Sequence, residues 1–246
     1  MRKTTVLLFL GAALAASAPH SLGEYGLSGW YGLNTSDMMP EGNLRLGTVL
    51  EFVDTDSGSI MTVPLRGNLG LSDNLEISAE IPFVPSDNAF EGSMTGDFTV
   101  AGGWLYETTR GGTALKLTGR LTLPTGDELR DSGTELAVGG ITSTTFVDFR
   151  LSMAGEYILN GGGNPFKETI SDYFRFTGGG ASYITGDLLL LGSLTGSTAG
   201  ELTAVVSTEY LPIDNLALNG GISAGLDDWT GFGFHAGAYW TESNVF

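Results

Sequence analysis

The stretch that decides the fold is residues 75–81 (LEISAEI), in which apolar residues alternate with polar or small ones. Successive side chains of a β-strand point to opposite faces of a sheet, so this pattern predicts a strand with one apolar and one polar face. The same period of two recurs at 115–123 (LKLTGRLTL) and at 149–153 (FRLSM). Amphipathic strands are therefore the building unit of this chain.

Working outward from this stretch, twelve such runs follow one another from residue 43 onward, separated by turn residues about every 10 to 20 positions. They lie at 43–53, 60–71, 75–84, 97–107, 113–124, 134–143, 148–158, 173–184, 187–195, 201–210, 216–225 and 230–240. Their lengths centre on the roughly 9–11 residues that a tilted strand needs to cross a bilayer.

Two architectures give this alternation. A soluble sandwich turns its apolar faces inward, whereas a transmembrane barrel turns them toward lipid and keeps polar faces for the lumen. The even number of runs, their lengths and the small residues of the polar face favour the barrel. Those small residues are Gly103, Ala137, Gly139, Ala154, Gly179 and Gly221. We therefore predict an all-β fold, a transmembrane antiparallel up-and-down β-barrel of about 12 strands.

Residues 1–18 have the features of a secretory signal peptide that is cleaved from the mature chain. Arg2 and Lys3 are basic, residues 6–16 are apolar but too short to span a bilayer as a helix, and 16–18 (ASA) supply small residues for cleavage. The predicted organisation is a signal peptide at 1–18, an N-terminal segment at 19–42 and an outer-membrane barrel at 43–246.

The N-terminal segment, residues 19–42, carries apolar side chains such as Tyr25, Trp30 and Leu33 ahead of the barrel. Exposing them to water would cost free energy, so we expect the segment to contact the lumen, where it would act as a plug. The alternatives are a free tail and an extra edge strand.

Connection lengths predict the orientation of the barrel. Connections three, five and seven (85–96, 125–133 and 159–172) are longer than the even-numbered ones. Short turns of bacterial barrels face the periplasm and longer loops face outward, so an even number of strands places both termini in the periplasm. The predicted location is the bacterial cell outer membrane, with outer-membrane lipid and lipopolysaccharide as surroundings.

Composition excludes several classes of function. Lys and Arg number 11 against 28 Asp and Glu, a net charge of −17, which excludes a nucleic-acid partner because phosphates need basic residues. The absence of Cys excludes a disulfide scaffold, a zinc–thiolate site and a cysteine nucleophile. No spacing of His with acids predicts a metal site, and we expect no cofactor.

Three motifs resemble a known family. Residues 70–77 (GLSDNLEI) with 81–83 (IPF), the pair Gly96-Asp97, and 121–127 (LTLPTGD) are similar to motifs of a bacterial outer-membrane family named after the meta-pathway of phenol degradation, whose members are called transporters. The resemblance is clearest over about residues 40–140. It implies an outer-membrane barrel that passes hydrophobic or aromatic compounds inward.

Charged residues on the polar faces are the candidate site, because they would line the lumen and the transport path. These residues, with the one histidine of the barrel, are Arg45, Glu51, Arg66, Glu76, Glu80, Lys116, Arg120, Arg150, Glu156, Arg175 and His235. Acids and bases alternate around the wall, which predicts either a cross-braced lumen or a specific solute path. A hairpin closed by Leu71 and Leu75 sets Arg66 opposite Glu80, although Arg120 is an alternative partner for Glu80.

Other chemistry is sparse. Some outer-membrane barrels hydrolyse lipids with a Ser–His dyad on their outer surface, but His235 has inward parity, so we do not expect an enzyme. The acids Asp54, Asp56, Asp87, Asp227 and Asp228 lie at the predicted outer mouth. They would either bind Ca²⁺ or Mg²⁺ through oxygen ligands or, as we favour, simply be solvated.

The function predicted from the sequence is passive uptake of small, largely hydrophobic or aromatic solutes through an outer-membrane channel. The alternatives are a structural or interaction barrel with a blocked lumen and an outer-membrane lipid-modifying enzyme.

Overall fold

The computed structural model describes residues 27, 29–30, 32–55, 58–87, 94–109, 113–126, 134–146, 149–160, 172–227 and 231–246. The signal peptide predicted at 1–18, and part of the N-terminal segment, lie outside these residues. Among the described residues, no helix is long and apolar enough to cross a membrane.

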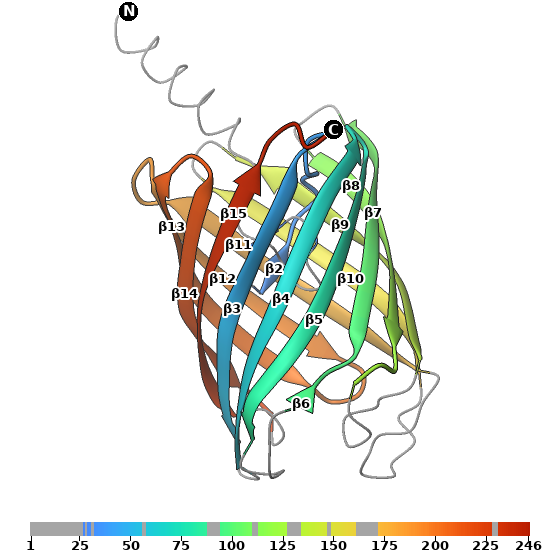
Figure 1. Cartoon of the computed structure of the whole chain (residues 1–246), viewed down its shortest axis with the longest axis vertical. Coiled ribbons are helices and arrows are strands. Elements are labelled where there is room, and N and C mark those ends of the chain that lie inside the picture. The colour runs from blue at the N-terminus through green and yellow to red at the C-terminus, as the bar shows by residue number, and fades with distance from the viewer. Residues whose placement is uncertain are drawn as a thin grey trace, which may run out of the picture.

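Twelve long strands form one closed antiparallel barrel, as Figure 1 shows. They are β3 (Leu44–Thr55), β4 (Gly58–Ser72), β5 (Leu75–Asp87), β7 (Phe98–Thr109), β8 (Thr113–Leu123), β9 (Glu135–Thr145), β10 (Arg150–Asn160), β11 (Tyr173–Tyr183), β12 (Leu188–Ser197), β13 (Leu202–Ile213), β14 (Leu216–Gly225) and β15 (Phe232–Glu242). Each pairs with the long strands next to it in sequence, and β15 pairs with β3 to close the barrel. The predicted up-and-down barrel of twelve strands is confirmed.

The described residues also form three strands of two residues each. β1 (Gly29–Trp30) and β2 (Leu33–Asn34) form a small hairpin of their own, and β6 (Met94–Thr95) pairs with the far part of β5. The connection predicted at 85–96 is therefore partly strand, because β5 continues to Asp87 and β6 adds to its edge.

The β4–β5 hairpin confirms most of the predicted register and corrects its turn. Arg66 lies opposite Glu80 and Gly70 lies opposite Glu76, as predicted. The predicted closing pair of Leu71 with Leu75 is wrong: Ser72 lies opposite Leu75 across a two-residue turn. The register shifts by one residue between Gly70 and Ser72, and this irregularity absorbs the residue that a three-residue turn would have used.

The outer face of the barrel is apolar. The side chains of Leu117, Leu151 and Met153 are 42%, 43% and 66% exposed, and a closed barrel in water would gain nothing from such exposure. Near one end, the rings of Trp104 and Tyr106 meet edge to face at 5.8 Å, as in the aromatic girdles of transmembrane barrels. The outer surface therefore fits a lipid environment.

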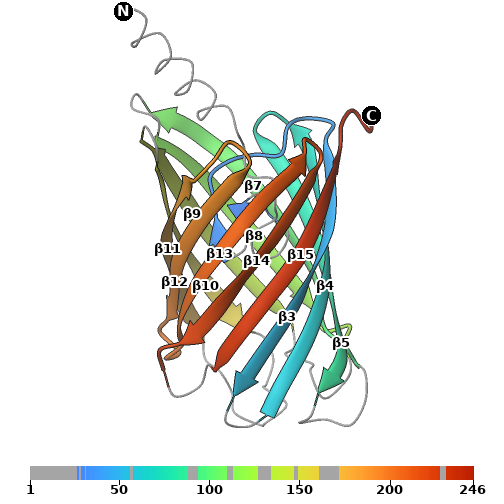
Figure 2. The same cartoon turned by 90° about the vertical axis from the view of Figure 1, so that its left-hand side faces the viewer.

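Residues 32–42, called the lumen segment below, lie within the barrel. β2 lies beside β10 and β11, and Figures 1 and 2 show it inside the ring of strands. The segment leaves the barrel next to the chain's last residues, as shown by the hydrogen bond that Val245 N–H donates to the carbonyl of Gly42 at 2.8 Å. This end also carries the turns at 73–74, 184–187 and 214–215 and is called the turn end.

The core of the molecule is the lumen itself. Among the described residues, two apolar clusters lie on its wall: one joins Leu33 of the lumen segment to Ala181, Leu189 and Leu191, and the other consists of Val49, Ala217 and Tyr239. Much of the remaining buried surface is polar or charged.

Candidate functional site: the barrel lumen

Arg66 on β4 forms the predicted ion pair across the β4–β5 hairpin. Its Nε donates to Glu80 Oε2 at 2.6 Å, and its Nη2 donates to Glu51 Oε1 of β3 at 3.1 Å. The side chains of Arg66 and Glu80 are only 7% and 12% exposed. Burial weakens solvent screening, so this three-strand cluster braces the wall.

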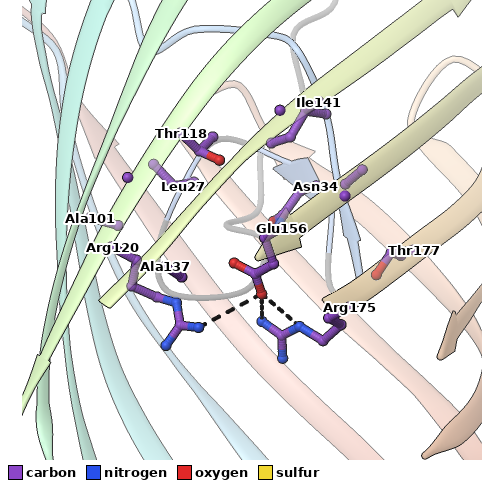
Figure 3. Close-up of a pocket in the computed structure, with 14 residues that line it drawn as sticks. Leu27, Asn34, Ala101, Thr118, Arg120, Ala137, Ile141, Glu156, Arg175 and Thr177 are labelled. Carbon is purple, nitrogen blue, oxygen red and sulfur yellow. Dashed lines mark hydrogen bonds and ion pairs between the residues drawn. The ribbon is translucent and has the colours of Figure 1, made fainter. Parts of the chain in front are cut away.

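A second charged cluster lies on β8–β11, as Figure 3 shows. Glu156 on β10 lies between two guanidinium groups: Arg175 Nε donates to its Oε1 at 2.6 Å, and Arg120 Nη2 lies 3.7 Å from the same oxygen. Arg120 also donates to Glu135. Arg120 therefore pairs with acids of β9 and β10, and the described residues show no ion pair between it and Glu80.

A third pair, Lys116 with Glu76, is completely buried. Lys116 Nζ donates to Glu76 Oε1 at 2.9 Å, and both side chains are 0% exposed. Asn68 Nδ2 also donates to this carboxylate, to Oε2 at 3.2 Å. Two buried charges require such matched partners, because an unpaired buried charge would lower the free energy of unfolding by several kcal/mol.

The lumen segment is hydrogen-bonded to the charged wall along its length. Arg150 Nη2 donates to Asp37 Oδ1 at 2.7 Å, and Lys116 Nζ donates to the Asp37 carbonyl at 2.9 Å. Met39 N–H donates to Glu76 Oε2 at 3.0 Å. Residues of β5, β8 and β10 thus meet at one point of the segment, its Asp37–Met39 stretch.

Two serines of the wall add to this contact. Ser36 N–H donates to Ser143 Oγ at 2.9 Å, and Ser152 Oγ donates to the Asn34 carbonyl at 2.7 Å. Sequence reasoning missed Asp37 as a site residue, because the segment has no period that would place it against particular strands. It also missed Ser143 and Ser152, although their inward parity was readable from the alternation.

His235 lies on the inner face of β15, 3% exposed, with its Nε2 2.8 Å from Ser207 Oγ of β13. The bond spans the intervening strand β14 at Gly221, where an added Cβ would lie 2.7 Å from His235 Cε1. Only glycine at 221 leaves room for this contact. The sequence placed His235 inside but gave no partner for it.

The remaining predicted site residue, Arg45, is 5% exposed and donates from Nε to Thr241 Oγ1 of β15 at 2.9 Å. All eleven predicted site residues therefore carry side chains on the inner face of the wall. Their service as a transport path stays a prediction.

Between the lumen segment and β8–β11 lies a cavity of about 30 Å³, lined in part by Asn34, Arg120 and Glu156 (Figure 3). This is room for only one or a few water molecules.

No group of three or more His, Asp and Glu side chains within the described ranges is arranged to hold a metal ion. Of the acids at the predicted outer mouth, Asp54 is exposed and Asp227 accepts from Leu202 N–H. Asp56, Asp228 and the side chain of Asp87 lie outside the described residues.

The closed twelve-strand wall, apolar outside and charged within, is the architecture of outer-membrane barrels. No protein-family model and no curated protein sequence matches the chain. Among solved structures, it is similar to an outer membrane channel from Pseudomonas putida F1, with 13% identity and a TM-score of 0.64, over 84% of this chain and 98% of that one.

The fold is also similar to the KdgM porin in complex with disordered oligogalacturonate, with 10% identity and a TM-score of 0.61, over 80% of this chain and 98% of that one. The outer membrane phospholipase A from Escherichia coli is similar with 11% identity and a TM-score of 0.52, over 82% and 93%. At these identities the likeness shows the fold.

Proposed function

We propose that this chain is a bacterial outer-membrane channel for the passive uptake of small, largely hydrophobic or aromatic solutes. The observation that supports this proposal most strongly is the different chemistry of the two faces of the barrel wall. Exposed apolar side chains cover its outside, and the inside carries charged pairs together with apolar clusters such as Leu189 and Leu191. A lumen with both surfaces suits a solute that must leave water and make apolar contact without becoming trapped.

The outer membrane, with its lipid and lipopolysaccharide, is the proposed location. In support, the fold is shared with outer-membrane channels and porins, and the exposed apolar surface needs lipid. The folded protein should require detergent, migrate differently on gels when unheated, and give a β-rich circular dichroism spectrum. Folded β structure that is soluble without detergent would contradict the proposal.

Solute flux into liposomes tests the channel directly. Liposomes containing the purified barrel should take up labelled toluate faster than empty liposomes do. The carboxylate makes toluate the suitable probe, because toluene and short alkanes cross a phospholipid bilayer without a channel. Liposomes with heat-unfolded protein at the same ratio serve as the control. Equal uptake into all three preparations would refute transport.

The resemblance of residues 70–77 and 121–127 to the phenol-degradation transporters supports the same class of solutes. Competition in the flux assay sharpens this point, because an aromatic channel should be slowed more by benzoate or phenol than by a sugar of similar size. Inhibition by the sugar alone would favour a porin for hydrophilic solutes instead.

A barrel with a permanently blocked lumen is the second candidate, and the lumen segment favours it. In that case flux would be absent in the native chain and would stay absent when the segment is loosened, as described below.

The Ser207–His235 pair gives a lipid hydrolase little support. Ser207 is 1% exposed and lies on the lumen face, so the bilayer lipid cannot reach its hydroxyl. Phospholipid turnover by the purified barrel, abolished by Ser207→Ala, would revive the enzyme.

A further inference from the structure

The lumen segment offers the wall two different chemical groups. Its Asp37 presents a carboxylate to Arg150 and a carbonyl to Lys116, at 2.7 and 2.9 Å. Its Leu33, 1% exposed, packs into the apolar cluster with Leu189 and Leu191. The segment therefore binds the wall as an acidic, partly apolar ligand would.

The wall is shaped to receive this segment. At Gly70 of β4 an added Cβ would lie 2.1 Å from the Pro40 carbonyl oxygen, so any side chain there would collide with the segment's backbone. Gly70 O also accepts from Gly42 N–H, and Gly70 N–H donates to the Asn43 carbonyl, both at 3.0 Å. The close approach and the paired hydrogen bonds define a docking position.

Withdrawal of the lumen segment would remove hydrogen-bond partners from three charged side chains of the wall. Lys116 would lose a carbonyl acceptor, Arg150 would lose a carboxylate, and Glu76 would lose the Met39 N–H. Buried polar groups whose partners leave cost free energy unless something replaces them. An incoming carboxylate restores the negative charge beside Arg150, whereas water or a neutral solute does not.

From these contacts we infer that Arg150 forms a binding site for the carboxylate of an amphipathic organic acid, which the Asp37 side chain occupies when the lumen segment is docked. Lys116, which donates to the Asp37 carbonyl, lies beside this site. The apolar body of the acid lies on Ala181, Leu189 and Leu191, where Leu33 now packs. This inference rests on the proposed channel function and narrows its solutes to acids. Four extended residues span at most about 14 Å, which limits the length of an acid that contacts both surfaces.

Displacement of the segment can be measured without transport, because the natural chain has no cysteine. Ser36, 2% exposed in the docked segment, is replaced by Cys, and the rate of maleimide labelling is followed in micelles. The probes are 3-phenylpropionate and its uncharged isostere 3-phenylpropanamide. The acid should accelerate labelling in proportion to its occupancy, and the amide should not.

Three variants in the Ser36→Cys background locate the effect. Asp37→Asn should accelerate labelling without ligand by roughly tenfold or more, because a charge-assisted bond stabilises by an amount worth at least a factor of ten. Asp187→Asn, an exposed acid in a turn at the same end, is the matched control and should label like the parent. Arg150→Gln should also label quickly and should lose the response to 3-phenylpropionate.

A second reporter guards against misfolding at position 36. Met39→Cys, at a residue 1% exposed, should give the same order of rates in any preparation that keeps the gel shift of a folded barrel. The inference would be overturned if the acid and the amide accelerated labelling equally at both reporters. It would also be overturned if neither compound accelerated labelling at either reporter.

Flux separates this inference from the function on which it rests. If the acid accelerates labelling but no solute crosses the liposome membrane, the binding site stands and the channel function fails. If acid and amide cross equally well and neither alters labelling, the channel stands and the carboxylate site fails.

Discussion

Two three-strand parts of the lumen wall are held together differently, and they are called the charged half (β8–β10) and the packed half (β13–β15) below. On β8–β10 the inner face carries Lys116, Arg120, Glu135, Arg150 and Glu156, and each forms an ion pair. On β13–β15 the inner face carries mostly small or uncharged residues around Ser207, Gly221 and His235, whose contact depends on close backbone packing. The charged half is hydrogen-bonded to the lumen segment through Lys116 and Arg150, so these two groups would need new partners if the segment left.

The largest effect should come from breaking the buried pair of the charged half. Glu76→Ala leaves Lys116 buried beside an empty position and should cost about 3–5 kcal/mol of unfolding free energy. Urea unfolding in micelles measures it, with exposed Glu201→Ala as the matched control. A loss for Glu76→Ala no greater than that of the control would mean that the charged half is not braced by this pair.

In the packed half, overpacking should matter more than charge. Gly221→Ala places a Cβ 2.3 Å from the Val206 carbonyl oxygen and 2.7 Å from His235, and the resulting shifts should cost about 1–3 kcal/mol. Gly119→Ala on β8 is the control, since an added Cβ there meets nothing within 4 Å. Equal unfolding midpoints for the two variants would remove the distinction between the halves.

Arg66 and Glu80 form another ion pair of the wall, outside these two parts, and a double-mutant cycle can test whether they interact directly. Arg66→Ala, Glu80→Ala and the double variant should reveal a coupling of roughly 0.5–3 kcal/mol in urea unfolding. The coupling should be higher when Glu51 is also replaced, because Glu51 otherwise still pairs with the guanidinium after Glu80 is removed. Additivity within about 0.3 kcal/mol, as for independent sites, would contradict a direct pair.

The smallest effect should follow from Ser207→Ala. A single neutral hydrogen bond contributes about 0.5–1.5 kcal/mol, so this variant should unfold slightly earlier than wild type in urea. Thr185→Ala, in an exposed turn, should change stability less. A loss above that of Gly221→Ala would show that the hydrogen bond, and not the packing, holds this half.

The alternation of the sequence was sufficient to predict the twelve long strands and the faces of most of them. Leu117 and Lys116 are adjacent in sequence yet lie outside and inside the barrel because the period of a strand is two. The same period gave the opposition of Arg66 and Glu80, since a short turn fixes the register of a hairpin. It failed at the turn itself, where a shift after Gly70 moved Ser72 opposite Leu75.

Partners across several strands could not be predicted in this way. Lys116 and Glu76 lie on β8 and β5, with β7 between them, so their meeting depends on barrel curvature and side-chain length. Leu189 and Leu191 lie in a run of four leucines (188–191) that gives no alternation, and their inward direction follows only from the register with β13. Asp37 was missed because the lumen segment belongs to no sheet of the barrel.

The seam between β3 and β15 has a consequence for the order of assembly. It joins residues from opposite ends of the barrel sequence, such as Leu44 with Glu242, so it carries the greatest loop-closure entropy and should form last. Within the described ranges, the groups after residue 43 that hydrogen-bond residues 33–43 lie between Gly70 and Ser152, apart from Val245 N–H near the end of the chain. A sheet that has not yet closed into a barrel can therefore bind the lumen segment. The bound segment would then act as a template around which the sheet curves. Deleting residues 33–40 should then slow refolding, even if the finished barrel is equally stable. The rate is measured from the gel band of the folded barrel, which migrates differently from the heated, unfolded chain.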